Sequence, residues 1–215
     1  MFDSRHASLR SCALAVSVPL FLAASSARAQ PPTEISGRHE HEGLFLHALI
    51  GPSFILATTT ADGEDLSASG GGATLRLSAG YNVARNLVVF AELFGDVTVS
   101  PTFEAGDVME EPEDTAFGVS GIGAGLAYYF GGNFYVSGSV DVVSLSLEYE
   151  EGGRTVTRVS DEGLGGNVSL GREFWVSDGW AIGVAMQAFL GSVPGGDERD
   201  WTVGAFGAGL SATFD

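Results

Sequence analysis

The strongest constraint on this chain is a two-residue alternation of large apolar side chains with glycine and small polar ones. In the segment 116–130, Ile122, Ala124 and Leu126 alternate with glycines at 121, 123 and 125, and the same period recurs in 74–81 and 164–171. Successive side chains of a strand point to opposite faces, so this period predicts β-strands. Because glycine weakens helix interiors, 31 glycines among 215 residues also disfavour a helical bundle.

Eight extended runs follow one another, joined in turn by long and short connections. The runs are 43–56, 72–81, 87–99, 116–130, 134–149, 163–175, 180–191 and 201–214. The short connections are 82–86, 131–133 and 176–179, and the longer ones are 57–70, 100–115, 150–162 and 192–200. In the fifth run the apolar phase slips near Val142-Val143, and we expect a β-bulge there.

The two faces of most runs differ in a way that a membrane explains. One face is large and apolar, whereas the other is glycine, serine, threonine, asparagine and a few charges, which cannot form a dry core. Lipid solvates an outward apolar face while the polar face lines the lumen. The runs are 10–16 residues long, and roughly 9–11 tilted residues cross the hydrocarbon. We therefore predict an all-β fold, a closed antiparallel up-and-down transmembrane β-barrel of about eight strands.

The N-terminal segment has the pattern of an export signal. Arg5 and Arg10 precede an apolar stretch at 12–24, and Ala27 and Ala29 are the small residues of a cleavage site. We expect residues 1–29 to be a secretory signal peptide, 30–42 a flexible N-terminal segment and 43–215 the barrel. A buried helix at 12–24 is the alternative. The single cysteine lies inside the expected signal, so no disulfide is predicted.

Charge and hydropathy exclude two other classes. The formal net charge is −17, and all ten basic residues are arginines, whereas nucleic-acid binding needs a basic footprint. Beyond the N-terminal segment no apolar run approaches 18 residues, so no membrane-spanning helix is expected. The glycines at 70–72 and 121–125 are not phosphate loops, because no helix follows them.

Aromatic residues gather at the strand ends next to the short connections. They are Tyr81, Tyr128, Tyr129, Phe130, Phe134, Tyr135, Phe174, Trp175, Trp180 and Phe214. Amphipathic rings prefer the headgroup level, so this pattern predicts an aromatic girdle, with the short connections in the periplasm and the long ones outside. Packing in a core is the alternative for any single ring.

The chain resembles the small outer-membrane β-barrel family, of the OmpA-barrel or porin-like type. The resemblance rests on the signal end at 27–29, on the segment 121–130 and on the near-terminal Phe214. In that family the last strand carries an assembly signal that ends in an aromatic residue with a glycine five positions earlier, and Gly209 and Phe214 match it. The resemblance implies a place in the outer membrane of a Gram-negative-type bacterium, with outer-membrane lipid and the barrel-assembly machinery as partners.

Five charged residues fall on the face expected to line the lumen. They are Arg76, Glu92, Asp96, Asp141 and Glu173. An isolated charge in a narrow lumen is costly, so we expect pairing, first between Arg76 and Glu92, whose strands are hairpin neighbours. A polar plug that holds the barrel together is the main interpretation, and a gate or proton-sensitive pore is the alternative.

Two further clusters are candidates for cation binding. The acids of the segment 104–114 are Glu104, Asp107, Glu110, Glu111, Glu113 and Asp114. Such oxygen clusters can hold Ca²⁺ or Mg²⁺, but no EF-hand spacing is present, so we expect a solvated surface loop. His39 and His41, with His47 nearby, form a second candidate without an ordered scaffold. No metal and no cofactor are therefore predicted.

These observations predict a structural or surface-interaction barrel whose lumen is plugged by polar side chains. A narrow channel for small solutes is the alternative. A lipid-modifying enzyme ranks third, because His47 is the single histidine inside an expected strand and the sequence shows no partner to orient it. No catalytic residue is predicted, and the ligand is unknown.

Overall fold

The computed structural model describes residues 43–61, 64–106, 108–112, 114–195 and 199–214. The chain divides into Met1–Arg38 and a compact unit, His39–Asp215, and all described residues belong to the second. Among them, no helix is long and apolar enough to cross a membrane. The expected signal peptide and the histidines at 39 and 41 lie outside the described residues and stay predictions.

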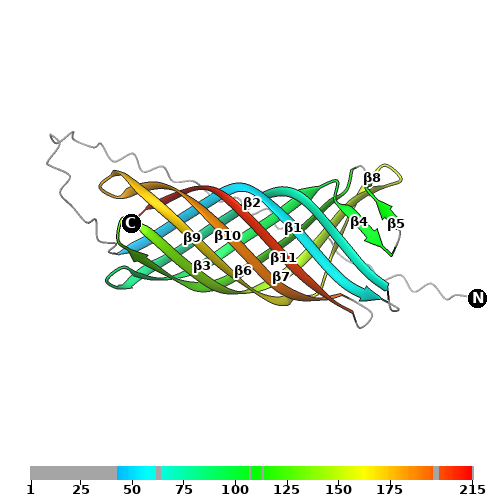
Figure 1. Ribbon diagram of the computed structural model, residues 1–215, viewed down its shortest axis with the longest axis horizontal. Helices are drawn as coiled ribbons and strands as arrows, with labels where there is room; N and C mark the ends of the chain where they lie inside the picture. The colour runs from blue at the N-terminus through cyan, green and yellow to red at the C-terminus, as the bar shows by residue number, and fades with distance from the viewer. Residues whose placement is uncertain (1–42, 62–63, 107, 113, 196–198, 215) are drawn as a thin grey trace, which may run out of the picture. The chain divides into compact units, whose positions relative to one another are not determined.

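Eight antiparallel strands close into a ring (Figure 1). They are β1 (Leu44–Ala61), β2 (Glu64–Ala84), β3 (Leu87–Val99), β6 (Ala116–Phe130), β7 (Phe134–Glu151), β9 (Gly163–Ser177), β10 (Trp180–Gly195) and β11 (Arg199–Phe214). The ring closes because β1 pairs with β2 on one side and with the last strand, β11, on the other. The predicted fold, a closed up-and-down barrel of about eight strands, is confirmed.

The two ends of the barrel differ in how the strands are joined. At the turn end the connections are tight, and Asn86 and Asn133 take the left-handed conformation, with φ of 61° and 58°, that such turns require. At the loop end the strands extend into hairpins, with added strands β4 (Thr102–Ala105), β5 (Val108–Glu110) and β8 (Arg154–Val159). β4 pairs with β2 and β8 pairs with β7. Three of the four long connections, 57–70, 150–162 and 192–200, therefore consist largely of strand residues, so the prediction of loops there was wrong, whereas 100–115 is strand only in the short β4 and β5.

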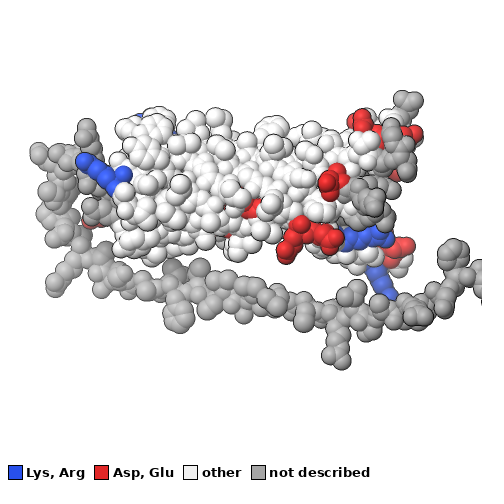
Figure 2. Space-filling model, turned by 90° about the horizontal axis from the view of Figure 1, so that it is seen from below, with Lys and Arg blue, Asp and Glu red and all other residues white. Residues whose placement is uncertain are grey.

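The outward face of the ring is a continuous apolar surface, here called the apolar belt. It comprises the outward side chains of 44–56 on β1, 75–83 on β2, 89–99 on β3, 122–130 on β6, 134–142 on β7, 164–176 on β9, 180–190 on β10 and 206–210 on β11. Leu126, Val168 and Leu210 are examples, each more than half exposed. Figure 2 shows this belt as a broad surface with few charges, while acidic side chains gather towards one end. Since water would penalise such a surface, lipid is its solvent.

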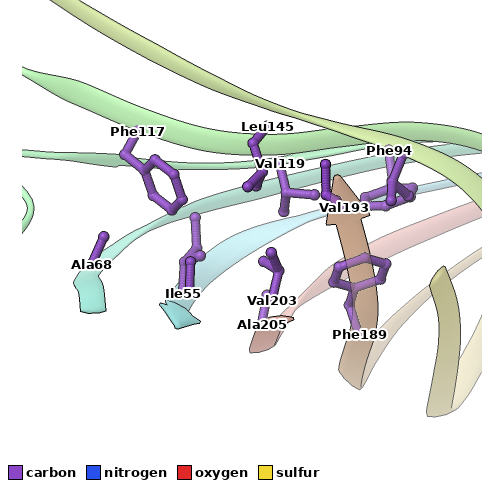
Figure 3. Packing of buried hydrophobic residues seen from close by; sticks show 12 residues of the cluster. Ile55, Ala68, Phe94, Phe117, Val119, Leu145, Phe189, Val193, Val203 and Ala205 are labelled. Carbon is purple, nitrogen blue, oxygen red and sulfur yellow. The ribbon is translucent and has the colours of Figure 1, made fainter. Parts of the chain in front are cut away.

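The interior differs from the expectation that only small and polar residues line it. Two buried apolar clusters fill the barrel: one towards the loop end, and a second towards the turn end. In the first, Phe94 and Phe189 face one another across the lumen, with ring centroids 5.2 Å apart, and Phe117 lies beside Ile55 (Figure 3). A layer of buried charged residues lies between these clusters, formed by Arg76, Glu92, Asp96 and Asp141. The sequence prediction of a polar lumen therefore holds for the middle of the barrel, whereas at both ends apolar clusters lie beside the remaining buried polar residues.

The apolar phase slip in β7 is not a bulge. The pairing of β7 with β6 runs without interruption through Val142 and Val143, which lie opposite Ile122 and Gly121. Val143 and Leu145 are buried because they point into the loop-end cluster, whereas Val142 points outward to lipid. The slip therefore marks the level at which the lumen turns from polar to apolar.

The predicted aromatic girdle forms from part of the expected set. Tyr81, Tyr128, Phe130, Phe134, Phe174 and Trp180 are exposed on the outward face. Tyr129 and Tyr135, by contrast, are 2 % exposed and belong to the turn-end interior cluster. Because β6 and β7 pair directly at these positions, their two inward rings meet, with centroids 5.4 Å apart. For these two tyrosines the alternative of core packing is the correct one.

Inward glycines make the space that the interior aromatic rings occupy. A Cβ at Gly121 would lie 2.6 Å from the Phe94 ring, and one at Gly125 would lie 2.7 Å from the Phe90 ring. These pairs are direct cross-strand partners between β3 and β6. The glycine-rich side of β6 therefore follows from packing, since two facing rings would not fit in an eight-stranded lumen.

Candidate functional site: the barrel interior

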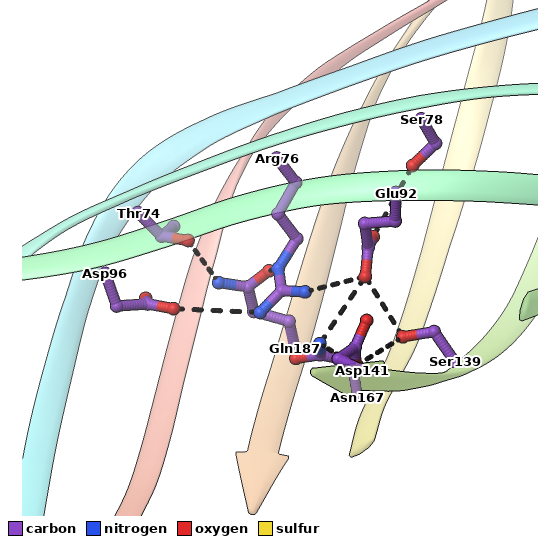
Figure 4. A network of polar contacts seen from close by, with 9 residues as sticks. All are labelled: Thr74, Arg76, Ser78, Glu92, Asp96, Ser139, Asp141, Asn167 and Gln187. Atoms are coloured by element: carbon purple, nitrogen blue, oxygen red, sulfur yellow. Dashed lines mark hydrogen bonds and ion pairs between the residues drawn. The ribbon is translucent and has the colours of Figure 1, made fainter. Parts of the chain in front are cut away.

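The middle of the lumen holds a hydrogen-bonded network centred on Arg76 of β2 (Figure 4). Arg76 Nη1 lies 3.2 Å from Glu92 Oε1, and Arg76 Nη2 lies 3.7 Å from Asp96 Oδ2. Both carboxylates come from β3, the hairpin partner of β2, so the antiparallel register delivers them. Arg76 and Asp96 are 2 % and 1 % exposed, and a charge so deeply buried is tolerated when it is paired.

Amide and hydroxyl groups from distant strands complete this network. Asn167 of β9 donates to Asp141 Oδ2 over 2.9 Å and to Glu92 Oε1 over 3.4 Å. Ser139 Oγ of β7 lies 3.0 Å from one oxygen of each of the same two carboxylates and shares its single proton between them. Asp141 is thereby linked to Glu92 through neutral donors instead of through the guanidinium. The network ties together β3, β7 and β9, which are not all neighbours in the sheet.

Gln187 of β10 bridges the network to the far wall. Its amide Nε2 donates to Thr74 Oγ1 over 2.6 Å, and its Oε1 accepts from Arg76 Nε. Sequence reasoning missed Gln187, and the signal for it was present. Between Ala181 and Val193 it is the single inward residue of β10 that carries a hydrogen-bonding side chain. A polar residue in an otherwise apolar inward series predicts a partner across the lumen.

Glu173 does not join the other four charged residues. It lies nearer the turn end, where its Oε1 accepts from Thr213 over 2.6 Å and from Tyr129 over 3.3 Å. The expected group of five charges therefore divides into a central set of four and Glu173, which binds hydroxyl groups. The division follows from position, since Glu173 lies six residues further along β9 than Asn167 of the central network.

The central network is stacked directly against the loop-end apolar cluster. The Arg76 Cζ atom lies 4.7 Å from the Phe94 ring centroid, a cation–π contact, and that ring is 5.2 Å from Phe189 on the opposite wall. On the turn side of the network, the void lined by Arg76 and Glu92 amounts to about 20 Å³. That volume is of the order of a single water, so side chains occupy most of the cross-section.

His47 lies inside the barrel beside the turn-end rings. Its Nε2 is 3.3 Å from Tyr135 Oη, and its ring stacks on Phe45 with centroids 6.0 Å apart. The contacts are those of a packed interior residue. His39 and His41, the other two histidines of the candidate cation cluster, lie outside the described residues.

The acidic segment forms part of the β4–β5 hairpin. Glu104 lies on β4 and Glu110 on β5, and Glu111 and Asp114 follow, all with exposed side chains. Asp107 and Glu113 lie outside the described residues. Within the described part of the chain, no group of three or more histidine, cysteine or acidic side chains is arranged to hold a metal ion. The loop predicted there is in fact a short hairpin.

The two residues of the expected assembly signal lie on β11 at the ring closure. Phe214 pairs with Leu46 of β1 and with Trp180 of β10, and its ring lies 5.2 Å from the Trp180 ring. Gly209 approaches the backbone of β1 so closely that a Cβ would lie within 3 Å of Ile50. Their role in assembly stays a prediction.

Closure, an outward apolar belt and a packed interior together define an integral β-barrel protein of the outer-membrane type. Contact with membrane lipid follows from the same belt. The fold expected from the family resemblance, a small outer-membrane barrel, is confirmed.

Three of the solved structures to which this chain is similar are the following. The attachment invasion locus protein Ail of Yersinia pestis, in complex with the heparin analogue sucrose octasulfate, is 16 % identical, with 79 % of this chain and 99 % of that chain covered and a TM-score of 0.42. Neisserial surface protein A is 18 % identical, with 79 % and 96 % covered and a TM-score of 0.47. The outer membrane protease OmpT of Escherichia coli is 9 % identical, with 80 % and 96 % covered and a TM-score of 0.39. No protein-family model and no curated protein matches the sequence.

Proposed function

We propose that this chain is a structural, surface-presenting barrel of the outer membrane, whose lumen is closed by its own side chains. The observation that carries the proposal is the layered interior, in which the Arg76 network is stacked on the Phe94–Phe189 contact. A solute would have to displace both a paired charge and a packed apolar layer. Each displacement is costly, because the first leaves buried charges without partners and the second opens a cavity.

The loop-end hairpins supply the surface-presenting part of the role. β7 and β8 extend the sheet past the belt through Tyr149 and Glu150, and β4 and β5 form a second extension beside β2. The exposed acids of these hairpins give this end a negative field that favours cationic partners or divalent cations bound to lipopolysaccharide. Hydrogen-bonded hairpins hold such a surface in a fixed shape better than free loops do.

A narrow channel is the second candidate, and the void beside Arg76 and Glu92 is the observation that favours it. A lumen with a charged layer conducts if the side chains above and below it move. An enzymatic role has less support, because His47, the histidine within the described residues, contacts Tyr135 and Phe45 in the packed interior. We therefore propose a non-enzymatic protein.

Single-channel recording tests the closed lumen. The full chain is inserted into a planar bilayer at 1 M KCl, an ionic strength at which porins give clear steps. We expect insertion, checked by heat-modifiable gel mobility, without resolved conductance steps. Stable, reproducible steps would instead establish the channel.

Epitope exposure tests the orientation on which the surface role depends. Gly152 and Gly153 form the β7–β8 turn with positive φ, so an epitope inserted between them leaves both strands intact. We expect antibody to stain intact cells that carry this insertion. The matched control, an insertion at Gly131-Gly132 in the β6–β7 turn, should stain only after the outer membrane is opened. The reverse pattern would contradict the proposed orientation.

A further inference from the structure

Arg172 of β9 is the single charged side chain that points outward within the apolar belt, among the residues that the structure describes. Its outward neighbours on β9 are Leu170 and Phe174, and its register partners are Phe134 on β7 and Val184 on β10. An arginine stays charged, and hydrocarbon penalises an unpaired charge. Its place therefore needs an anion supplied from outside the protein.

Two aromatic rings hold the guanidinium in place. The Arg172 Cζ atom is 4.9 Å from the Phe134 ring centroid and 5.0 Å from the Phe174 ring centroid. Both rings belong to the girdle at the turn end, where the belt meets the headgroups. An arginine at this depth places its stem in hydrocarbon and its charge at the phosphate level. The rings limit the directions in which the guanidinium can turn, which prepares it for one partner.

A groove on the lipid-facing surface adjoins Arg172. Its volume is about 650 Å³, and it crosses β9, β10, β11 and β1. Arg172, Val184, Leu210 and Ile50 form one row of successive register partners. A second row, Leu170, Met186 and Ala208, lies one step further from the turn end and so deeper in the bilayer. The groove therefore starts at the charge and continues towards the hydrocarbon.

We propose that Arg172 and this groove bind one glycerophospholipid of the turn-side leaflet. The phosphate accepts hydrogen bonds from the guanidinium, whose planar donors match phosphate oxygens, and an acyl chain lies along the Leu170–Met186–Ala208 row. The short turns face the periplasm, and phospholipids form the periplasmic leaflet of the outer membrane. Lipopolysaccharide lies at the opposite, loop end. The site is independent of whether the lumen conducts.

Native mass spectrometry of the full chain in dodecyl maltoside tests the phosphate contact, with added phosphatidylglycerol as the probe. We expect the wild-type protein to retain one lipid, and Arg172→Leu to lower the bound fraction about tenfold, the size of one charged hydrogen bond. Arg158→Leu is the matched control, since it removes the same charge from β8 outside the belt. Diacylglycerol, which lacks the phosphate, should bind more weakly and equally to both variants.

A second pair of variants tests the groove while Arg172 stays in place. Ala208→Phe fills the deeper row, and Ala79→Phe fills a separate outward groove, which is lined by Leu77 and Leu93. We expect reduced phosphatidylglycerol retention in the first and wild-type retention in the second, with heat-modifiable mobility unchanged in both. Equal retention by wild type and Arg172→Leu would overturn the proposal. The proposal would also be overturned if Arg172→Leu lost bound lipopolysaccharide while its bound phosphatidylglycerol stayed unchanged.

Discussion

Asp141 of β7 lies directly opposite Gly123 of β6, and its carboxylate occupies the space that a side chain at position 123 would need. A Cβ there would also lie against the backbone oxygen of Val140. The central network therefore requires a glycine at position 123 as much as it requires the side chains that form it. Asp141 keeps its bonds to Ser139 and Asn167 because the facing strand leaves it room.

Gly123→Ala is therefore expected to destabilise the barrel. The new methyl group must push Asp141 out of the network or separate β6 from β7, at a cost of about 2 kcal/mol. Urea unfolding of protein folded into lipid vesicles measures this change. Gly138→Ala is the control, because a Cβ there would meet its nearest atom, the Asn167 carbonyl oxygen, at an ordinary 3.6 Å. Equal stability of the two variants would refute the crowding argument.

Removing Arg76 should cost more than removing Arg76 and one of its partners together. Arg76→Met leaves Glu92 and Asp96 buried without their cation, and we expect a loss of about 3 kcal/mol or more in the free energy of unfolding. Adding Glu92→Gln to that variant removes one of the uncompensated charges and should restore part of the loss. The exposed Arg158→Met control should stay within about 0.5 kcal/mol of wild type. A double variant as unstable as the sum of the single ones would argue against an interacting pair.

The loop-end apolar layer should act as a barrier to ions. Phe94→Ala with Phe189→Ala removes two rings that meet across the lumen, and we expect conductance steps where the wild type shows none. The matched control is Phe54→Ala with Phe206→Ala, a ring pair 5.6 Å apart on the outward face. That control should stay silent in planar bilayers. Conductance steps in the control double variant, or no conductance in the interior double variant, would show that this apolar layer is not the barrier to ions.

Phe214 is expected to matter for assembly in cells more than for stability. Phe214→Ala removes the ring that contacts Trp180 at the seam where β11 meets β1, and the family resemblance assigns this ring to the signal read by the assembly machinery. We expect the amount of heat-modifiable barrel in outer membranes to fall, while refolding from urea into vesicles changes little. Phe206→Ala serves as the control on the same strand. Equal losses in both assays would indicate a packing role alone.

The strand pattern could be predicted from the sequence because lipid and lumen impose opposite demands on alternate residues. Leu75, Ile122 and Val168 face outward as that pattern requires. The pattern could not place Val143 and Leu145, since an inward valine is indistinguishable from an outward one until the height of each lumen layer is known. The phase slip near Val142-Val143 therefore predicted a β-bulge, whereas the pairing of β6 with β7 is uninterrupted there.

The sequence also could not show which particular residues contact one another across the lumen. The pairing of Arg76 with Glu92 follows from a hairpin, which sequence order reveals. The contact between Arg76 and Gln187 joins residues that are 111 positions apart in the sequence. It depends on the stagger of the strands with which the sheet closes into a barrel. Tyr129 and Tyr135 were assigned to the girdle for the same reason, because one residue of register decides whether a ring meets lipid or the lumen.

Spin labelling along β9 tests most directly whether the large apolar side chains face lipid. In a Cys12→Ser background, single cysteines replace each residue from 164 to 170, and each label is tested with oxygen, which concentrates in lipid, and with a water-soluble nickel complex. We expect strong oxygen relaxation at positions 164, 166, 168 and 170, and weak relaxation by both reagents at 165, 167 and 169. If the even positions instead respond to nickel and not to oxygen, the apolar belt is not in a membrane and the account is wrong.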